Sequence, residues 1–153
     1  MKEPFVVWSD QYSIGVDTVD EQHKGLFSLT NDLYDACMEV GGGVASEHFK
    51  DVLQKAVSYV AMHFSTEEKI MQATKDPNYD EHQREHDLFV RKVMKEAANL
   101  DSGGDDAPEI FMNFLRDWIA KHVNGTDIKI GQHIMSLKEK GALTADMVTL
   151  IHH

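Results

Sequence analysis

Apolar side chains recur along this sequence at alternating spacings of three and four residues, which is the pattern of one face of an α-helix. The pattern covers residues 17–38, 46–73, 79–100 and 111–122. We therefore predict four amphipathic helices, each of which buries one face.

Polar residues interrupt each of these apolar faces at one end. They are His23, His63, Glu67, His82, His86 and His122. They fall near the start of the first and third predicted helices and near the end of the second and fourth. If consecutive helices run in opposite directions, all of them lie at the same end of a bundle. A polar side chain in a core must be compensated, and imidazoles gathered with carboxylates are usually compensated by a metal ion.

Short segments rich in turn-forming residues separate the predicted helices. They are residues 41–43, 74–78 and 101–106. Short connections favour antiparallel neighbours. The predicted fold class is therefore all-α, an up-and-down antiparallel four-helix bundle with a short N-terminal arm and a C-terminal extension.

Composition narrows the classes of function. A chain of 153 residues can bury a full core as one domain. Its net charge of −11 opposes binding to nucleic acids and to anionic membranes. The single cysteine, Cys37, stands on an apolar face and cannot form an internal disulfide. No signal peptide or membrane-spanning segment is apparent, so we expect a cytoplasmic protein with no membrane or nucleic-acid partner.

The ligand chemistry favours a pair of metal ions. Imidazole suits zinc, copper, nickel and iron, and the chain has no thiolate cluster of the kind that holds structural zinc or iron–sulfur centres. With Asp127 added, the candidate ligands exceed what one ion accepts. Two ions that share the carboxylates and an oxygen bridge fit iron better than zinc, which prefers four ligands. Spacing alone would accept other metals.

Asp127 is the least expected member of this set. Five residues after His122 on a regular helix, it would point away from the other candidates. Asn124 and Gly125 between them are a helix-stop signal, and an unwound turn there would bring Asp127 back.

Four motifs in the chain resemble those of the hemerythrin family and its bacterial relatives. They are Asp20-Glu21-Gln22-His23, His63-Phe64-Ser65-Thr66-Glu67-Glu68, His82-Gln83-Arg84-Glu85-His86 and the segment from Trp118 to Asp127. The resemblance covers most of the chain, and its four-part motif is more specific than any single pair of histidines. It implies a non-haem di-iron protein that binds oxygen within an up-and-down four-helix bundle.

The resemblance also implies how the ligands divide between two iron ions. One iron would be held by His82, His86 and His122, and the other by His23 and His63. Glu67 and Asp127 would bridge the two ions, together with an oxo or hydroxo group. Oxygen would bind at the two-histidine iron, which has the vacant position.

Apolar residues next to these ligands match the family's oxygen pocket. They are Leu26, Phe64, Trp118 and Ile119. A reversible carrier must exclude water and protons, so its pocket should be apolar. No general acid stands out on the predicted faces, which favours oxygen carriage over catalysis. The expected function is reversible oxygen binding, for carriage, storage or delivery, in a protein that is not an enzyme and whose small-molecule partner is dioxygen.

Other function classes are weaker or stay open. A ferritin-like di-iron oxidase would need Glu-x-x-His pairs, and no glutamate stands three residues before any candidate histidine. An oxygen- or redox-sensing domain of a signalling protein would use the same ligands, and peroxide or nitric oxide could react at the open iron. The protein partner, a signalling module or an oxygen-using enzyme, is not determined by the sequence.

The resemblance divides the chain into a bundle, residues 1–133, and a C-terminal extension, residues 134–153. The extension has a weak helical pattern and either packs on the bundle or serves as a linker. Our hypothesis is that Leu143, Met147 and Leu150 bury against the bundle.

Four further polar residues have less defined expectations. Glu68 is either solvated or a hydrogen-bond partner of a ligand, and Asp20 either caps the first helix or orients His23. His48 and His133 are expected to be surface residues.

Overall fold

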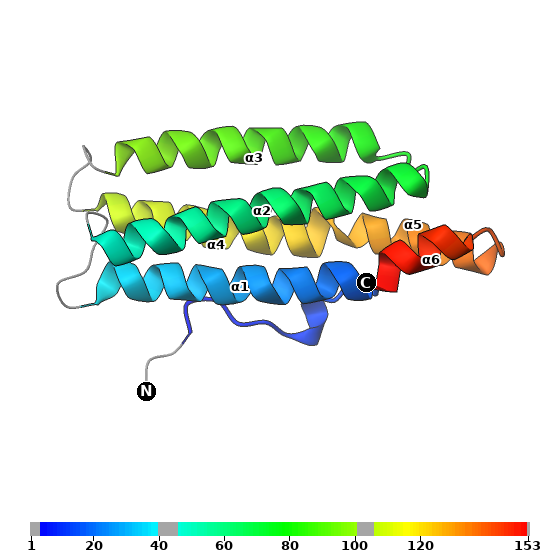
Figure 1. Ribbon diagram of the computed structural model, residues 1–153, viewed down its shortest axis with the longest axis horizontal. Helices are drawn as coiled ribbons and strands as arrows, with labels where there is room; N and C mark the ends of the chain where they lie inside the picture. The colour runs from blue at the N-terminus through cyan, green and yellow to red at the C-terminus, as the bar shows by residue number, and fades with distance from the viewer. Residues whose placement is uncertain (1–3, 40–45, 101–105, 153) are drawn as a thin grey trace.

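A bundle of four long helices dominates the structure. The computed structural model describes residues 4–39, 46–100 and 106–152, and these residues contain helices but no strand. The bundle helices are α1 (Asp17–Met38), α2 (Glu47–Ala73), α3 (Tyr79–Asn99) and α4 (Ala107–Lys121). They lie side by side and alternate in direction (Figure 1). The predicted up-and-down four-helix bundle is confirmed.

Local signals fix several helix ends. The Ser46 hydroxyl accepts a 3.0 Å hydrogen bond from the Phe49 amide and so caps α2. Pro108 lies in the first turn of α4, where its missing amide proton costs nothing. Between α2 and α3, Asp76 accepts a 2.8 Å bond from the Asn78 amide and closes the predicted turn. The predicted turn at residues 41–43 lies outside the described residues, as does all but Asp106 of the segment 101–106.

The chain does not stop after α4. A π-helical turn, η2 (His122–Thr126), follows directly, and α5 (Ile128–Glu139) then continues the same rod (Figure 1). The prediction that Asn124 and Gly125 end the helix is therefore wrong. The helix α5 also spans the predicted boundary between the bundle, which was expected to end at residue 133, and the C-terminal extension, which was expected to begin at residue 134.

The last helix, α6 (Ala145–His152), folds back onto the bundle beside α1 and α2. Thr18 at the start of α1 directs its hydroxyl at two carbonyl oxygens of α6, those of Ile151 at 2.7 Å and Leu150 at 3.0 Å. These carbonyls have no partner within α6 because they lie in its last turn. Ile151 is buried, and Leu143 and Leu150 pack partly buried beside it.

The N-terminal arm runs along α1 and includes the short helix η1 (Asp10–Tyr12). The amide and carbonyl of Val6 pair with the Asn31 side chain at 2.8 and 2.9 Å. Further along, Asp20 accepts hydrogen bonds from the Ser13 hydroxyl at 2.6 Å and from the Ile14 amide at 2.9 Å. Asp20 therefore holds the arm, and it neither caps α1 nor contacts His23.

Two of the three apolar clusters occupy opposite parts of the bundle, and the third contains Val6, Leu26, Phe27, Ile119 and Val123. The distal cluster contains Leu33, Ala36, Cys37, Phe49, Val52, Phe64, Phe89, Val93, Leu100, Phe111, Met112 and Leu115. The proximal cluster contains Ile14, Val16, Val19, Ile70, Met71, Ile130, Ile134 and Ile151. Burial of these side chains is the main source of stability in a domain of this size.

Among the described residues, no helix is long and apolar enough to cross a membrane.

Candidate metal centre

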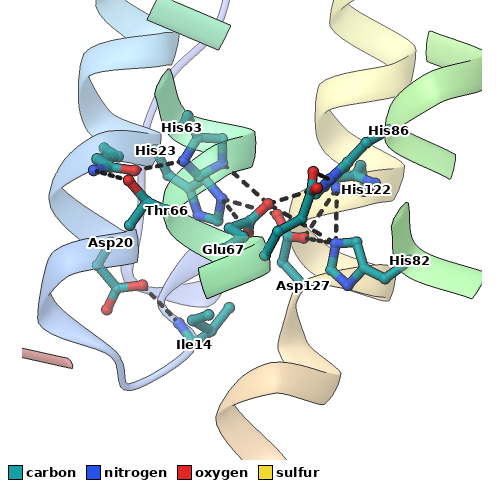
Figure 2. Close-up of polar contacts among 12 residues, drawn as sticks. Ile14, Asp20, His23, His63, Thr66, Glu67, His82, His86, His122 and Asp127 are labelled. Carbon is teal, nitrogen blue, oxygen red and sulfur yellow. Dashed lines mark hydrogen bonds and ion pairs between the residues drawn. The ribbon is translucent and has the colours of Figure 1, made fainter. Parts of the chain in front are cut away.

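The polar residues that interrupt the apolar faces meet in one buried site. They are His23 on α1, His63 and Glu67 on α2, His82 and His86 on α3, His122 in η2 and Asp127 just after it. None is more than 4 % exposed. Figure 2 shows Glu67 and Asp127 between the histidines of α1 and α2 on one side and those of α3 and η2 on the other. The structure thus brings together all seven residues singled out in the sequence.

The three-histidine group consists of His82, His86 and His122 with the two carboxylates, and one atom from each member lies within 4.8 Å of the others. The Nε2 atoms of His82 and His122 each lie 2.9 Å from Asp127 Oδ1. His86 Nε2 lies 3.1 Å from Glu67 Oε1. These ring nitrogens converge on a common point, the arrangement that a bound cation requires.

The two-histidine group consists of His23 and His63 with the same carboxylates. His23 Nε2 lies 2.9 Å from Asp127 Oδ2, and His63 Nε2 lies 3.4 Å from Glu67 Oε1. Asp127 therefore turns one carboxylate oxygen to each group. A carboxylate in this position can bridge two metal ions.

The π-helical turn explains how Asp127 enters the site. The Asp127 amide donates a 2.8 Å hydrogen bond to the His122 carbonyl, five residues back instead of four. The wider turn accommodates one extra residue, so His122 and Asp127 face the same side of the helix. The sequence predicted a local departure from α-helix here, but as an unwound turn.

Ring nitrogens on the outer side of the site contact further side chains, two through hydrogen bonds and one, in His122, through an ion-pair contact. His63 Nδ1 lies 2.8 Å from Gln22 Oε1, His86 Nδ1 lies 3.0 Å from Glu68 Oε2, and His122 Nδ1 lies 3.5 Å from Glu85 Oε2. Such partners fix the orientation and tautomer of metal-binding histidines. Of the two readings of Glu68, the structure favours the hydrogen-bond partner.

Gln22 and Glu85 are site residues that the sequence did not reveal. Both stand directly before a candidate ligand in the chain, yet Gln22 contacts His63 on another helix, and Glu85 contacts His122. Only the register between helices makes these pairs.

The donor set fits a metal ion. Seven buried atoms of the site have no hydrogen-bond partner: both ring nitrogens of His23, both oxygens of Glu67, both oxygens of Asp127 and Nε2 of His86. Because Glu68 is an acceptor, His86 donates from Nδ1, and its Nε2 lone pair faces a Glu67 oxygen 3.1 Å away. When Glu67 is ionised these two acceptors repel, and a cation between them removes the repulsion.

Burial and neighbouring charges shift the pKa values of the histidines in different directions. Burial, followed by the charge of His23, lowers the pKa of His63 to about 3. Burial and then the charge of His82 lower the pKa of His86 to about 2. Burial also acts to lower the pKa of His23, but its contacts with Asp127 and Glu67 outweigh that effect and raise the pKa to about 9. Neutral His63 and His86 therefore keep lone pairs available for a metal ion.

The two carboxylates are shifted in opposite directions. Burial and then the charge of Asp127 raise the pKa of Glu67 well above its usual range. Burial acts in the same direction on Asp127, but the charge of His122 and its contacts with three histidines hold the pKa of Asp127 well below its usual range.

Aromatic side chains cover the three-histidine group. The Phe64 ring stacks on His86 with centroids 3.7 Å apart, and the Trp118 ring stacks on His122 at 4.2 Å. Leu26 and Ile119, the other two predicted pocket residues, line an apolar cavity of about 110 Å³ between the four bundle helices. Trp118 also packs, partly buried, against the apolar cluster that contains Leu26 and Ile119.

The two histidines predicted to be surface residues, His48 and His133, both lie outside the site. His48 is exposed, as expected. His133 is partly buried and donates from Nε2 to the Thr74 carbonyl at 2.7 Å, so the expectation of a surface residue was wrong for it. This bond ties α5 to the end of α2.

Known proteins share this fold and these elements. The family model of the hemerythrin HHE cation binding domain matches residues 14–133. A bacteriohemerythrin of Stenotrophomonas maltophilia is 29 % identical over 122 residues, covering 80 % of this chain and 76 % of that protein. A myohemerythrin of Sipunculus nudus is 28 % identical over 127 residues, covering 83 % of this chain and 91 % of that protein.

A solved structure agrees with these relatives. The crystal structure of a hemerythrin with one leucine replaced by tyrosine superposes with a TM-score of 0.75 at 26 % identity, covering 86 % of this chain and 98 % of that one. These relatives and the buried cluster of histidines and carboxylates fit a non-haem iron, oxygen-binding domain. Since the family model matches most of its length, the chain belongs to the hemerythrin HHE cation binding domain family.

Proposed function

We propose that this protein binds dioxygen reversibly at a pair of iron ions, as an oxygen carrier, store or delivery protein. His82, His86 and His122 would hold one ion, His23 and His63 the other, and Glu67 and Asp127 would bridge them with an oxo or hydroxo group. The iron pair would supply two electrons to dioxygen and take them back on release. The observation that carries the proposal is the unequal division of the histidines, which leaves the two-histidine group one ligand short of the other.

Apolar side chains close to ligands of both groups support reversible binding. Leu26 follows His23 by one turn of α1, and Ile119 precedes His122 by one turn of α4. Both are buried, and both line the apolar cavity. A wall of this kind keeps water and protons from the ions, which slows their irreversible oxidation.

The cavity offers no acid that could protonate a bound molecule. Thr30 is the one polar residue among those that line it. Its hydroxyl donates to the Leu26 carbonyl at 2.8 Å, so its proton is already engaged within α1. This environment favours release of oxygen over its reduction, and supports a binding protein in place of an enzyme.

A sensing role is the second candidate. It is favoured by the contact between α6 and the first turn of α1, since Thr18 lies five residues before His23 on the same helix. Movement of His23 on ligand binding would reach α6 through this rigid connection. A protein partner at α6 would then respond to the state of the iron pair.

Optical spectroscopy of the reduced protein tests the proposal. The purified, iron-loaded protein is reduced without oxygen, exposed to air and then flushed with argon. A visible charge-transfer band that appears with air and disappears under argon supports a reversible carrier. Irreversible conversion to a ferric spectrum would favour a redox sensor or a peroxide-reacting enzyme, and a zinc-loaded sample, which has no redox chemistry, is the control.

A further inference from the structure

A short chain of hydrogen bonds fixes the amide of Gln22. The Thr66 hydroxyl donates to the Met62 carbonyl at 3.1 Å, so its lone pair is free to accept from Gln22 Nε2, also at 3.1 Å. The amide oxygen of Gln22 therefore faces His63 Nδ1 at 2.8 Å. Because an amide oxygen only accepts, Nδ1 of His63 carries the proton, and the Nε2 lone pair faces the metal centre.

The backbone of Gln22 is held as well. The Tyr59 hydroxyl donates to the Gln22 carbonyl at 2.9 Å. Gly25 lies three residues after Gln22 on α1. Because it has no side chain, it leaves room for the Tyr59 hydroxyl, with which a Cβ atom at this position would collide. Tyr59 stands one turn before His63 on α2. Hydrogen bonds therefore join α1 to α2 at Gln22, among them one from Tyr59 to its carbonyl and one from His63 to its side chain.

The three-histidine group has outer partners of a different kind. Its His86 and His122 face the carboxylates of Glu68 and Glu85 at 3.0 and 3.5 Å. The contact of His86 with Glu68 is a hydrogen bond, that of His122 with Glu85 is an ion-pair contact, and a carboxylate in either position makes the imidazole a stronger ligand. In the two-histidine group the partner of His63 is a neutral amide, and Nδ1 of His23 is buried without a hydrogen-bond partner.

We infer that Gln22 is a positioning residue that sets the tautomer of His63 and, as a neutral acceptor, keeps the two-histidine position the weaker of the two metal sites. The inference rests on one part of the proposed function, namely that the three-histidine group and the two-histidine group each bind a metal ion. A weaker position with one ligand fewer is the one at which an ion exchanges ligands readily. The carboxylates behind His86 and His122 hold the other ion firmly in place.

Titration of the metal-free protein with Co²⁺ tests this inference without oxygen chemistry. Visible absorption and calorimetry should resolve a tight and a weak binding step. The Gln22→Met variant keeps the shape of the side chain but lacks the acceptor, and should weaken the weak step by about tenfold or more while leaving the tight step unchanged. The Gln22→Glu variant replaces the amide with a carboxylate, and should tighten the weak step beyond that of the parent protein.

Controls separate this role from a structural one. Gln54→Met changes an exposed glutamine of α2 far from these hydrogen bonds and should leave both steps unchanged. Glu68→Gln should weaken the tight step alone. In the NMR spectrum of the Co²⁺-loaded protein, the shifted Nδ1 proton of His63 should persist in the parent and in Gln22→Glu, and exchange away in Gln22→Met.

The outcomes distinguish this inference from the proposed function. If Gln22→Met and Gln22→Glu weaken binding alike, or if neither changes it, Gln22 does not tune the site and the inference is wrong, although the metal centre stands. If the parent protein takes up no Co²⁺, the metal centre itself is refuted, and the inference with it.

Discussion

Asp127 faces the same side of its helix as His122, although five residues separate them, because the Asp127 amide bonds to the His122 carbonyl across a π-helical turn. In a regular α-helix, five residues correspond to about 500°, which would turn Asp127 about 140° away from His122. One widened turn thus places a carboxylate within 2.9 Å of three histidines on three helices.

This geometry makes the effects of a deletion and an insertion unequal. Deleting Gly125 would place Asp127 four residues after His122, on the same face of a regular α-helix, so both metal ions should be retained. Inserting one alanine after Gly125 should turn Asp127 away and remove at least one ion. Metal content by elemental analysis, with circular dichroism to confirm the helices, measures both. Gly125→Ala is the control, since a side chain there meets no neighbour. Equal metal content in the two variants would show that the turn does not place the ligand.

Replacing His86 with alanine should remove an iron ion. The change removes a ligand from the three-histidine group. It also removes the ring nitrogens that Glu67 and Glu68 contact in the parent protein. We expect a lower melting temperature, because metal binding contributes directly to folding. His48→Ala removes an exposed histidine of α2 and should keep the iron content of the parent. An unchanged iron-to-protein ratio in His86→Ala would contradict the ligand assignment.

Replacing Ile119 with alanine should speed oxidation of the reduced protein. The side chain is 2 % exposed and lines the apolar cavity three residues before His122, so its loss should admit water. Leu115→Ala is the matched control, because Leu115 lines the same cavity one turn further from His122. Both changes should cost about 2–5 kcal/mol of unfolding free energy, but only Ile119→Ala should raise the autoxidation rate. Equal rates in the two variants would mean that Ile119 does not guard the iron.

Replacing Thr18 with valine should loosen α6. The change leaves the carbonyls of Leu150 and Ile151 without the hydroxyl that they now accept from, at a cost of about 1–3 kcal/mol. Amide hydrogen exchange should become faster in residues 145–152 and stay slow in the four bundle helices. Thr149→Val is the control, since that hydroxyl bonds within α6 to Ala145. Unchanged exchange in α6 would show that its apolar contacts alone hold it.

The sequence predicted those features that depend on periodicity within one helix. His63 and Glu67 stand where an apolar residue is expected, and a polar residue on a buried face is visible without a structure. The pairing of Gln22 with His63 depends on how far α1 and α2 are shifted along each other, which no pattern within one helix encodes. His133 was misjudged for the same reason, because its partner Thr74 lies on another element.

The sequence predicted that the α-helix is interrupted before Asp127, but not that the interruption is a π-helical turn. Asn124 and Gly125 lower helix propensity, and such residues can end a helix or allow it to widen. Here packing of Ile130 and Ile134 in the proximal cluster keeps the following residues helical. Tertiary contacts decided between two outcomes that the local sequence permits.

The polar site lies between the distal and proximal clusters along α1 and α2. On α1, Val19 of the proximal cluster precedes His23 and Leu33 of the distal cluster follows it. On α2 the order is reversed, with Phe64 in the distal cluster and Ile70 in the proximal one. The metal ions would therefore join two apolar cores, the distal and proximal clusters, across a layer of unpaired polar groups that a third cluster borders with Leu26, Ile119 and Val123. With both ions bound, the domain should melt in a single cooperative transition; once they are removed, the two cores should melt separately, at different temperatures.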